Sequence, residues 1–152
     1  RDTLLSALPE ILFSTREEIK KVLPLASAVV IGPGIGLSKQ SEELVEYVLA
    51  NTKVPTVVDG DAITICAKKD ITFRDNFVLT PHVKEMSVLT GIPIPKLQED
   101  ILGTTKNMAK TRNCILVQRD VYKRQLLSRM GRNVMSMFPE IMEWQPVVRV
   151  MC

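Results

Sequence analysis

The chain has 152 residues, of which 45% are hydrophobic and 24% charged, enough for one domain with a buried core. No apolar run approaches the roughly 20 residues of a membrane-spanning helix, and we expect neither a membrane span nor a signal peptide. The net charge of +3 lies wholly in residues 119–152, which hold six Lys or Arg and three Asp or Glu. Residues 1–118 hold fourteen Lys or Arg and fourteen Asp or Glu, so they carry no net charge. The charge therefore does not indicate a nucleic-acid partner.

The cysteines and the first residue carry two further expectations. Cys66, Cys114 and Cys152 have no spacing typical of a metal site, and we expect no bound metal from them. Their odd number favours reduced thiols, as in a cytoplasmic protein. The chain opens on Arg1 and enters a structured pattern within a few residues, so we expect that further sequence precedes it.

The first predicted elements are a short helix and a buried strand. Residues 15–18 (Thr-Arg-Glu-Glu) fit a capping box, and residues 19–23 then supply the apolar face of a short helix that Pro24 helps to end. Residues 27–31 form an apolar run without polar alternation. Such a run is typical of a parallel strand that is covered on both faces.

This strand leads into a glycine loop. At Gly32, Gly34 and Gly36 the backbone can take a positive φ or approach a ligand with its N–H groups. A helix is predicted over residues 38–51, with Ser38 and Ser41 as candidate caps. Strand, glycine loop and helix together favour a ligand site, although the G-x-G-x-G spacing is not the Rossmann fingerprint and a packing role is the alternative.

Three further short apolar strands are predicted over residues 54–59, 77–80 and 114–118. The helices that alternate with them are predicted over residues 62–68, 83–89 and 94–112. Gly91 is expected to end the second of these helices, and residues 103–105 to interrupt the third. The alternation predicts an α/β fold with a parallel sheet and helices on both faces.

Polar residues gather where these strands end, and ligands of parallel α/β sheets bind outside the carboxyl ends of the strands. Asp59 and Asp61 are candidates for hydroxyl acceptors or metal-linked carboxylates, with capping of the next helix as the alternative. His82, the only histidine, is a candidate to donate to or accept from a polar ligand, or a structural group. Glu85 is a further candidate, with stabilisation of the first helical turn as its alternative.

Several stretches in this order resemble the ADP- or ATP-dependent NAD(P)H-hydrate dehydratases of the ribokinase-like superfamily. They are Pro9-Glu10, Ile31-Gly32-Pro33-Gly34-Ile35-Gly36, Val57-Val58-Asp59-Gly60-Asp61-Ala62, and Leu79-Thr80-Pro81-His82-Val83-Lys84-Glu85-Met86 with Leu89-Thr90-Gly91. The resemblance covers residues 7–118 and departs from the family pattern at Gly60, Thr64 and Val83-Lys84. It implies part of a ribokinase-like, Rossmann-like three-layer fold with a mostly parallel sheet.

The resemblance also implies an activity. Members dehydrate NADH or NADPH that is hydrated at C6 of the nicotinamide ring, at the expense of a phosphoryl group of ADP or ATP, with Mg²⁺. Carried over, contacts to the hydrated dinucleotide fall on Gly34, Gly36 and His82. Catalysis in the family uses the Asp of a G-x-G-D turn, which this sequence lacks, so no catalytic residue is assigned.

The family pattern ends near residue 118. Gln118-Arg119-Asp120 stands where the family has a Lys-Gly loop for the adenine nucleotide. Residues 120–125 (Asp-Val-Tyr-Lys-Arg-Gln) resemble the translation of a transposase mosaic-end sequencing adapter, with a natural basic hexapeptide as the alternative. We therefore predict that residues 119–152 are a non-native or chimeric tail, and that those beyond 125 pack poorly.

Two other functions stay open at this stage. One is a ribokinase-like small-molecule kinase of the thiazole or hydroxymethylpyrimidine type, and the other is a non-enzymatic dinucleotide-binding domain. Under the dehydratase hypothesis we expect an incomplete, inactive fragment that exposes an apolar sheet face and tends to aggregate. Preference for NADH or NADPH hydrate, use of ADP or ATP, and assembly as a monomer or homo-oligomer are left open.

Overall fold

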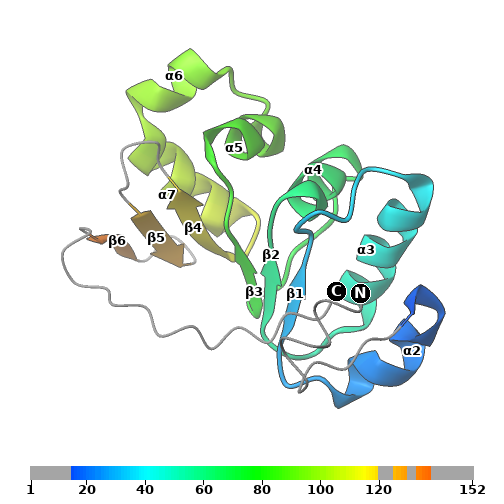
Figure 1. The fold of residues 1–152 in the computed structure, drawn as a ribbon. Helices are drawn as coiled ribbons and strands as arrows, with labels where there is room; N and C mark the ends of the chain where they lie inside the picture. The colour runs from blue at the N-terminus through cyan, green and yellow to red at the C-terminus, as the bar shows by residue number, and fades with distance from the viewer. Residues whose placement is uncertain (1–14, 120–124, 130–132, 138–152) are drawn as a thin grey trace, which may run out of the picture.

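The computed structural model describes residues 15–119, 125–129 and 133–137 (Figure 1). The described part begins with three short helical elements, η1 (Arg16–Glu18), α2 (Ile19–Val22) and η2 (Leu23–Leu25). The predicted capping box is present, because the Thr15 backbone N–H donates to Glu18 Oε2 at 2.9 Å. No helix of the described residues is long and apolar enough to cross a membrane.

Within the described residues, strands form one sheet in the order of the sequence. They are β1 (Val29–Ile31), β2 (Thr56–Val58), β3 (Phe77–Leu79), β4 (Ile115–Arg119), β5 (Gln125–Arg129) and β6 (Asn133–Met137). The first four strands pair in parallel, which confirms the prediction from their apolar runs and helix-length connections.

The last two strands depart from the expectation for the tail. We predicted that residues beyond 125 pack poorly, yet β5 pairs antiparallel with β4, and β6 antiparallel with β5. The pairing shows that the backbone of these described strands joins the sheet, while the packing of the tail stays a prediction. Antiparallel neighbours need no helical crossover between them.

The helices between the parallel strands lie close to their predicted positions. They are α3 (Lys39–Asn51), α4 (Asp61–Lys68), α5 (Val83–Thr90), α6 (Ile94–Glu99) and α7 (Ile101–Thr111). Gly91 ends α5 in the left-handed conformation at φ 69°, as predicted. The break in the last predicted helix falls at Asp100 and not at residues 103–105.

Asp100 explains the place of this break. Its side chain caps α7 by accepting from the Gly103 backbone N–H at 2.8 Å. A Cβ on Gly103 would lie 2.2 Å from Asp100 Oδ2, so the glycine leaves room for the cap. Gly103 thus favours the helix start that lies just before it.

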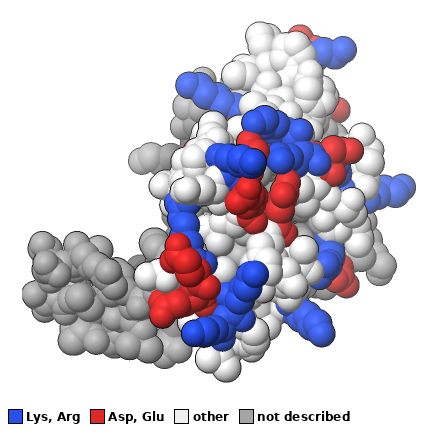
Figure 2. Space-filling view, turned by 90° about the vertical axis from the view of Figure 1, so that its right-hand side faces the viewer, with Lys and Arg blue, Asp and Glu red and all other residues white. Residues whose placement is uncertain are grey.

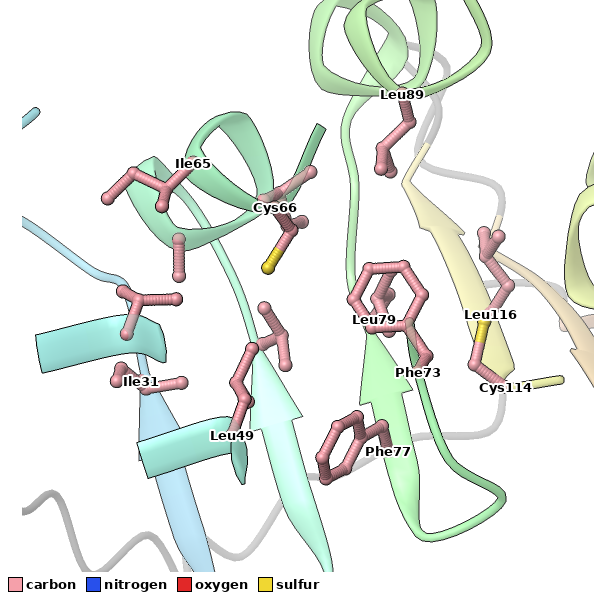
Figure 3. Packing of buried hydrophobic residues seen from close by; sticks show 14 of the residues in the cluster. Ile31, Leu49, Ile65, Cys66, Phe73, Phe77, Leu79, Leu89, Cys114 and Leu116 are labelled. Carbon is pink, nitrogen blue, oxygen red and sulfur yellow. The ribbon is translucent and has the colours of Figure 1, made fainter. Parts of the chain in front are cut away.

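The described helices gather on one face of the sheet. In Figure 1, α3, α4 and α5 follow one another in the same direction as β1, β2 and β3. Their buried side chains share one cluster with alternate residues of the strands, and Figure 3 shows Ile31, Leu79 and Leu116 in this cluster. The opposite rows carry half-buried apolar residues, namely Val30, Val57, Val78, Ile115 and Val117.

The expectation of helices on both faces is therefore not met within the described residues, which hold two of the three layers. The strand order gives the reason. Right-handed crossovers that always step in the same direction put every connecting helix on the same face of a sheet. A second helical layer requires a reversal of strand order, and β1 to β4 contain none.

The side of the molecule that carries α2 and α3 shows basic and acidic side chains next to one another (Figure 2). Part of this pattern is an ion-pair cluster between α3 and α4. Lys69 Nζ lies 3.3 Å from Glu42 Oε2 and 3.1 Å from Glu46 Oε1, and Lys68 also pairs with Glu42. These ion pairs connect the solvent-facing side of α3 with the end of α4.

Candidate functional site

The carboxyl ends of β1, β2 and β3 meet at one edge of the sheet. Ile31 is in register with Val58, and Val58 with Leu79, so the three following loops begin side by side. Two hydrogen bonds continue the ladder into these loops, from the Asp59 N–H to the Ile31 carbonyl at 3.0 Å and from the Thr80 N–H to the Val58 carbonyl at 3.2 Å. The sheet thus brings together the three stretches that the sequence singled out.

Gly32 fixes the distance between the first two loops. It has a φ of 122°, and a Cβ built on it would lie 1.7 Å from the Asp59 carbonyl oxygen. No side chain fits there, so glycine is required for the close approach of the two backbones. Gly34 and Gly36 also have positive φ, at 67° and 73°, but a Cβ on either would meet nothing within 4 Å. Both are exposed at the edge of the sheet.

Asp61 joins the same two loops by a hydrogen bond. The Gly36 backbone N–H donates to Asp61 Oδ2 at 2.8 Å. Asp61 is half-buried and begins α4, while Gly60 before it takes a φ of 55°. The sequence proposed Asp61 as a ligand group or a cap, and the structure shows that its carboxylate binds the glycine loop.

Asp59 lies directly after β2 and is half-buried. Its carbonyl oxygen accepts from the Ala62 N–H at 3.2 Å in the turn that leads into α4. The same carbonyl is the atom that Gly32 approaches. The backbone of Asp59 therefore shapes the site together with Gly32.

Two serines hold the far end of the glycine loop. Ser38 caps α3 by accepting from the Ser41 N–H at 3.2 Å, as the sequence predicted for this position. Ser41 is fully buried and its hydroxyl donates to the Ile35 carbonyl at 2.6 Å. The sequence suggests a helix cap here but gives no sign of this second role, because the bond runs back into the loop.

His82 and Glu85 form a capping box at the start of α5. The Glu85 N–H donates to His82 Nδ1 at 3.1 Å, and the His82 N–H donates to Glu85 Oε2 at 2.8 Å. Since Nδ1 accepts a backbone proton, Nε2 is the ring nitrogen that carries a proton, and it lies 3.3 Å from Glu85 Oε1. The His82 side chain is 47% exposed, whereas Glu85 is buried. His82 is thus open at the edge of the sheet, and Glu85 stabilises the first helical turn.

Two kinds of reactive group outside the three loops are possible metal ligands and the thiols. Among the described residues no three His, Cys, Asp or Glu side chains lie together in a group that could hold a metal ion. Burial raises the pKa of the Cys66 and Cys114 thiols to about 12. Both thiols therefore stay protonated near neutral pH and are poor nucleophiles.

Comparison with known proteins gives the family. The family model described as NAD(P)H-hydrate dehydratase matches residues 2–124. An ADP-dependent (S)-NAD(P)H-hydrate dehydratase of Streptococcus pneumoniae is 39% identical over 101 residues, which are 62% of this chain and 35% of that protein. A bifunctional NAD(P)H-hydrate repair enzyme of Coxiella burnetii is 33% identical over 105 residues, 69% of this chain and 21% of that protein.

Solved structures agree in fold. A ribokinase-like superfamily protein of Enterococcus faecalis has a TM-score of 0.77 at 24% identity, covering 86% of this chain and 47% of its own. The ADP/ATP-dependent NAD(P)H-hydrate dehydratase of Bacillus subtilis, co-crystallized with ATP/Mg²⁺, has a TM-score of 0.72 at 20% identity and covers 89% of this chain and 48% of its own.

The chain spans about a third or less of the two relatives compared above and about half of the solved structures. The family match includes all three loops of the candidate site and the four parallel strands. Both the ordered motifs and the sheet that carries them are thus those of one family. The chain belongs to the NAD(P)H-hydrate dehydratase family.

Proposed function

We propose that this chain is the dinucleotide-binding part of an ADP- or ATP-dependent NAD(P)H-hydrate dehydratase. The complete enzyme would remove water from hydrated NADH or NADPH and restore the cofactor. The observation that carries the proposal is the joined pair of loops at the carboxyl edge of the sheet, where Gly32 packs on Asp59 and Gly36 binds Asp61. This edge is where ligands of parallel α/β sheets bind.

Three residues are the proposed contacts to the hydrated dinucleotide. Gly34 and Gly36 are exposed and let the ligand approach the backbone closely, because neither carries a Cβ. The His82 side chain is 47% exposed, and Glu85 contacts both of its ring nitrogens, so the ring has a fixed orientation before the ligand arrives. Asp59, Asp61 and Glu85 support this edge through the contacts described above.

The described residues lack the loop that the resemblance implies for an adenine nucleotide. Where a Lys-Gly loop is implied, β4 continues through the buried Gln118 to Arg119. Mg²⁺ is usually held by one or two carboxylates together with the phosphates of its nucleotide, so a Mg²⁺ site would depend on that nucleotide being bound. We therefore assign no step of phosphoryl transfer to this chain. The family match extends to residue 124, so the tail proposed over residues 119–152 overlaps its last six residues.

The test compares this chain with a full-length gene rebuilt from the same source. We expect the chain to bind hydrated NADH measurably in calorimetry but to give no ADP- or ATP-dependent return of NADH absorbance, whereas the rebuilt enzyme gives both. The missing donors and carboxylate must act together at the reacting oxygen, so their loss abolishes turnover instead of slowing it.

Hydroxyethylthiazole and hydroxymethylpyrimidine serve as control ligands. Binding of either in preference to hydrated NADH would replace the dehydratase proposal with a kinase, whose fold is of the same kind. A hydroxyethylthiazole kinase of Pyrococcus horikoshii has a TM-score of 0.59 with this chain at 19% identity. Turnover by the short chain at the rate of the rebuilt enzyme would contradict the assignment of a binding part only.

A further inference from the structure

Two successive N–H groups of the glycine loop, those of Ile35 and Gly36, are bonded within the protein. Pro33 has no N–H, the Ile35 N–H donates to the Gly32 carbonyl at 3.3 Å, and the Gly36 N–H donates to Asp61 Oδ2 at 2.8 Å. At the start of the following helix, the Ser41 N–H is taken by the Ser38 hydroxyl. An anion-binding nest needs successive backbone N–H groups that are free to converge on one anion. This loop does not offer such a series.

Asp61 adds a negative charge at the same place. A carboxylate that accepts from a backbone N–H makes a charge-assisted hydrogen bond, roughly twice as strong as a neutral one. A phosphate group that sought the Gly36 N–H would have to displace this carboxylate and would also be repelled by it. The bond therefore keeps phosphate away from Gly36.

The surface beside Gly36 suits an uncharged group. Leu37 follows it directly and is 57% exposed, one of the large apolar side chains that the described part leaves open. An exposed leucine side chain beside a glycine, which has no Cβ, can make apolar contact with the face of a ligand ring. Ser38 and Asp61 fix the backbone on either side of this leucine.

We propose that the glycine loop receives the uncharged hydrated nicotinamide ring, and not the ribose or the pyrophosphate, and that Asp61 is the positioning residue that sets the loop for this. The inference rests on the proposed function, because it assumes a hydrated dinucleotide at this edge. Asp61 acts through Gly36 without touching the substrate. The ligand orientation follows: the pyrophosphate leads away from the loop.

Hydrated NADH, ADP-ribose and inorganic pyrophosphate distinguish the two ends of the ligand. ADP-ribose keeps the pyrophosphate but lacks nicotinamide. In amide-resolved NMR titrations we expect hydrated NADH to shift the Gly36 resonance, while ADP-ribose and pyrophosphate at the same concentrations leave it in place. A shift of Gly36 by ADP-ribose or pyrophosphate as large as that by hydrated NADH would overturn the orientation.

Substitutions at Asp61 test the positioning role without any ligand. We expect Asp61→Ala to raise hydrogen exchange at the Gly36 amide on the order of tenfold, the factor that a hydrogen bond to a charged group supports. Asp61→Asn, whose amide oxygen can still accept, should stay within about threefold of the unsubstituted chain. The matched control is Asp70→Asn, the same charge change beyond the other end of α4, where Asp70 pairs with Arg112.

The same variants separate the inference from the proposed function. Hydrated NADH should bind Asp61→Ala about tenfold more weakly and Asp61→Asn nearly normally, a rescue that a general loss of stability would not give. Unchanged Gly36 exchange in Asp61→Ala overturns the positioning role even if hydrated NADH binds. Absence of hydrated NADH binding to the unsubstituted chain overturns the proposed function, while Gly36 exchange still decides the role of Asp61.

Discussion

Gly32 is the residue on which the spacing of the first two loops depends. We expect Gly32→Ala to lower the free energy of unfolding by about 3 kcal/mol, because overpacking against the Asp59 carbonyl adds to an unfavourable φ. Gly34→Ala is the matched control: it also has a positive φ, but nothing crowds its Cβ, so it should cost only about 1–2 kcal/mol. Urea unfolding of both variants measures the difference, and equal losses would contradict the packing argument.

The residues of the site could be predicted only in part from the sequence. The glycine loop, the Asp59–Asp61 turn and His82 at a helix start are local patterns, and the structure places all of them at one sheet edge. The hydrogen bond from Gly36 to Asp61 could not be predicted, because it joins residues 25 positions apart. Ser41 shows the same limit, since its hydroxyl leaves its own helix to reach Ile35.

The stability that the ion pairs between α3 and α4 supply is expected to depend on pH. Hydrogen bonds from Lys68 and Lys69 hold the pKa of the Glu42 carboxyl below its usual 4.5. The folded state therefore favours the ionised carboxylate, so this stabilisation is present above about pH 4.5 and is lost as the pH falls through the lowered pKa. Glu42→Gln should be less stable than the unsubstituted chain at pH 7, and the gap should close on acidification.

The measurement is urea unfolding of both proteins between pH 7 and pH 3. Glu43→Gln serves as the control, because Glu43 is an exposed neighbour on the same helix. A gap between Glu42→Gln and the unsubstituted chain that persists undiminished at pH 3 would show that the ion pairs with Lys68 and Lys69 are not its cause.

Helices and strands with a clear hydrophobic pattern in the sequence were predicted well. The elements that were not predicted have physical causes. The four parallel strands follow from short apolar runs, but β5 and β6 carry no such pattern, and their pairing depends on the edge that β4 offers. The break at Asp100 escaped prediction because the cap uses a side chain that reaches forward to Gly103. Which face each helix covers depends on strand order, which local patterns do not encode.

The half-buried apolar face of the sheet is a surface through which whole molecules are expected to self-associate. Val57 lies at its middle, in register with Val30 and Val78, whereas Val58 next to it is fully buried in the core. We expect Val57→Thr to reduce concentration-dependent light scattering, because less apolar surface is left for self-association, at a stability cost below about 1 kcal/mol. Val58→Thr should instead cost about 1–3 kcal/mol by burying a hydroxyl.

Light scattering over a concentration series, paired with urea unfolding, checks both variants. Val58→Thr controls for the chemistry of the change, since the two substitutions differ only in the face on which they lie. Scattering by Val57→Thr equal to that of the unsubstituted chain would mean that association uses another surface, such as the edge of β1 that pairs with no other described strand.

The order of the strands also has a consequence for how the chain is made. Each of β2 to β6 pairs with the strand that precedes it in the sequence, so among the described strands only β1 waits for a partner that has yet to be synthesised. A chain that leaves the ribosome from its N-terminus can therefore extend this sheet one strand at a time, with every new strand arriving at an edge that already exists. A nascent chain paused within this stretch would hold a smaller sheet of the same register.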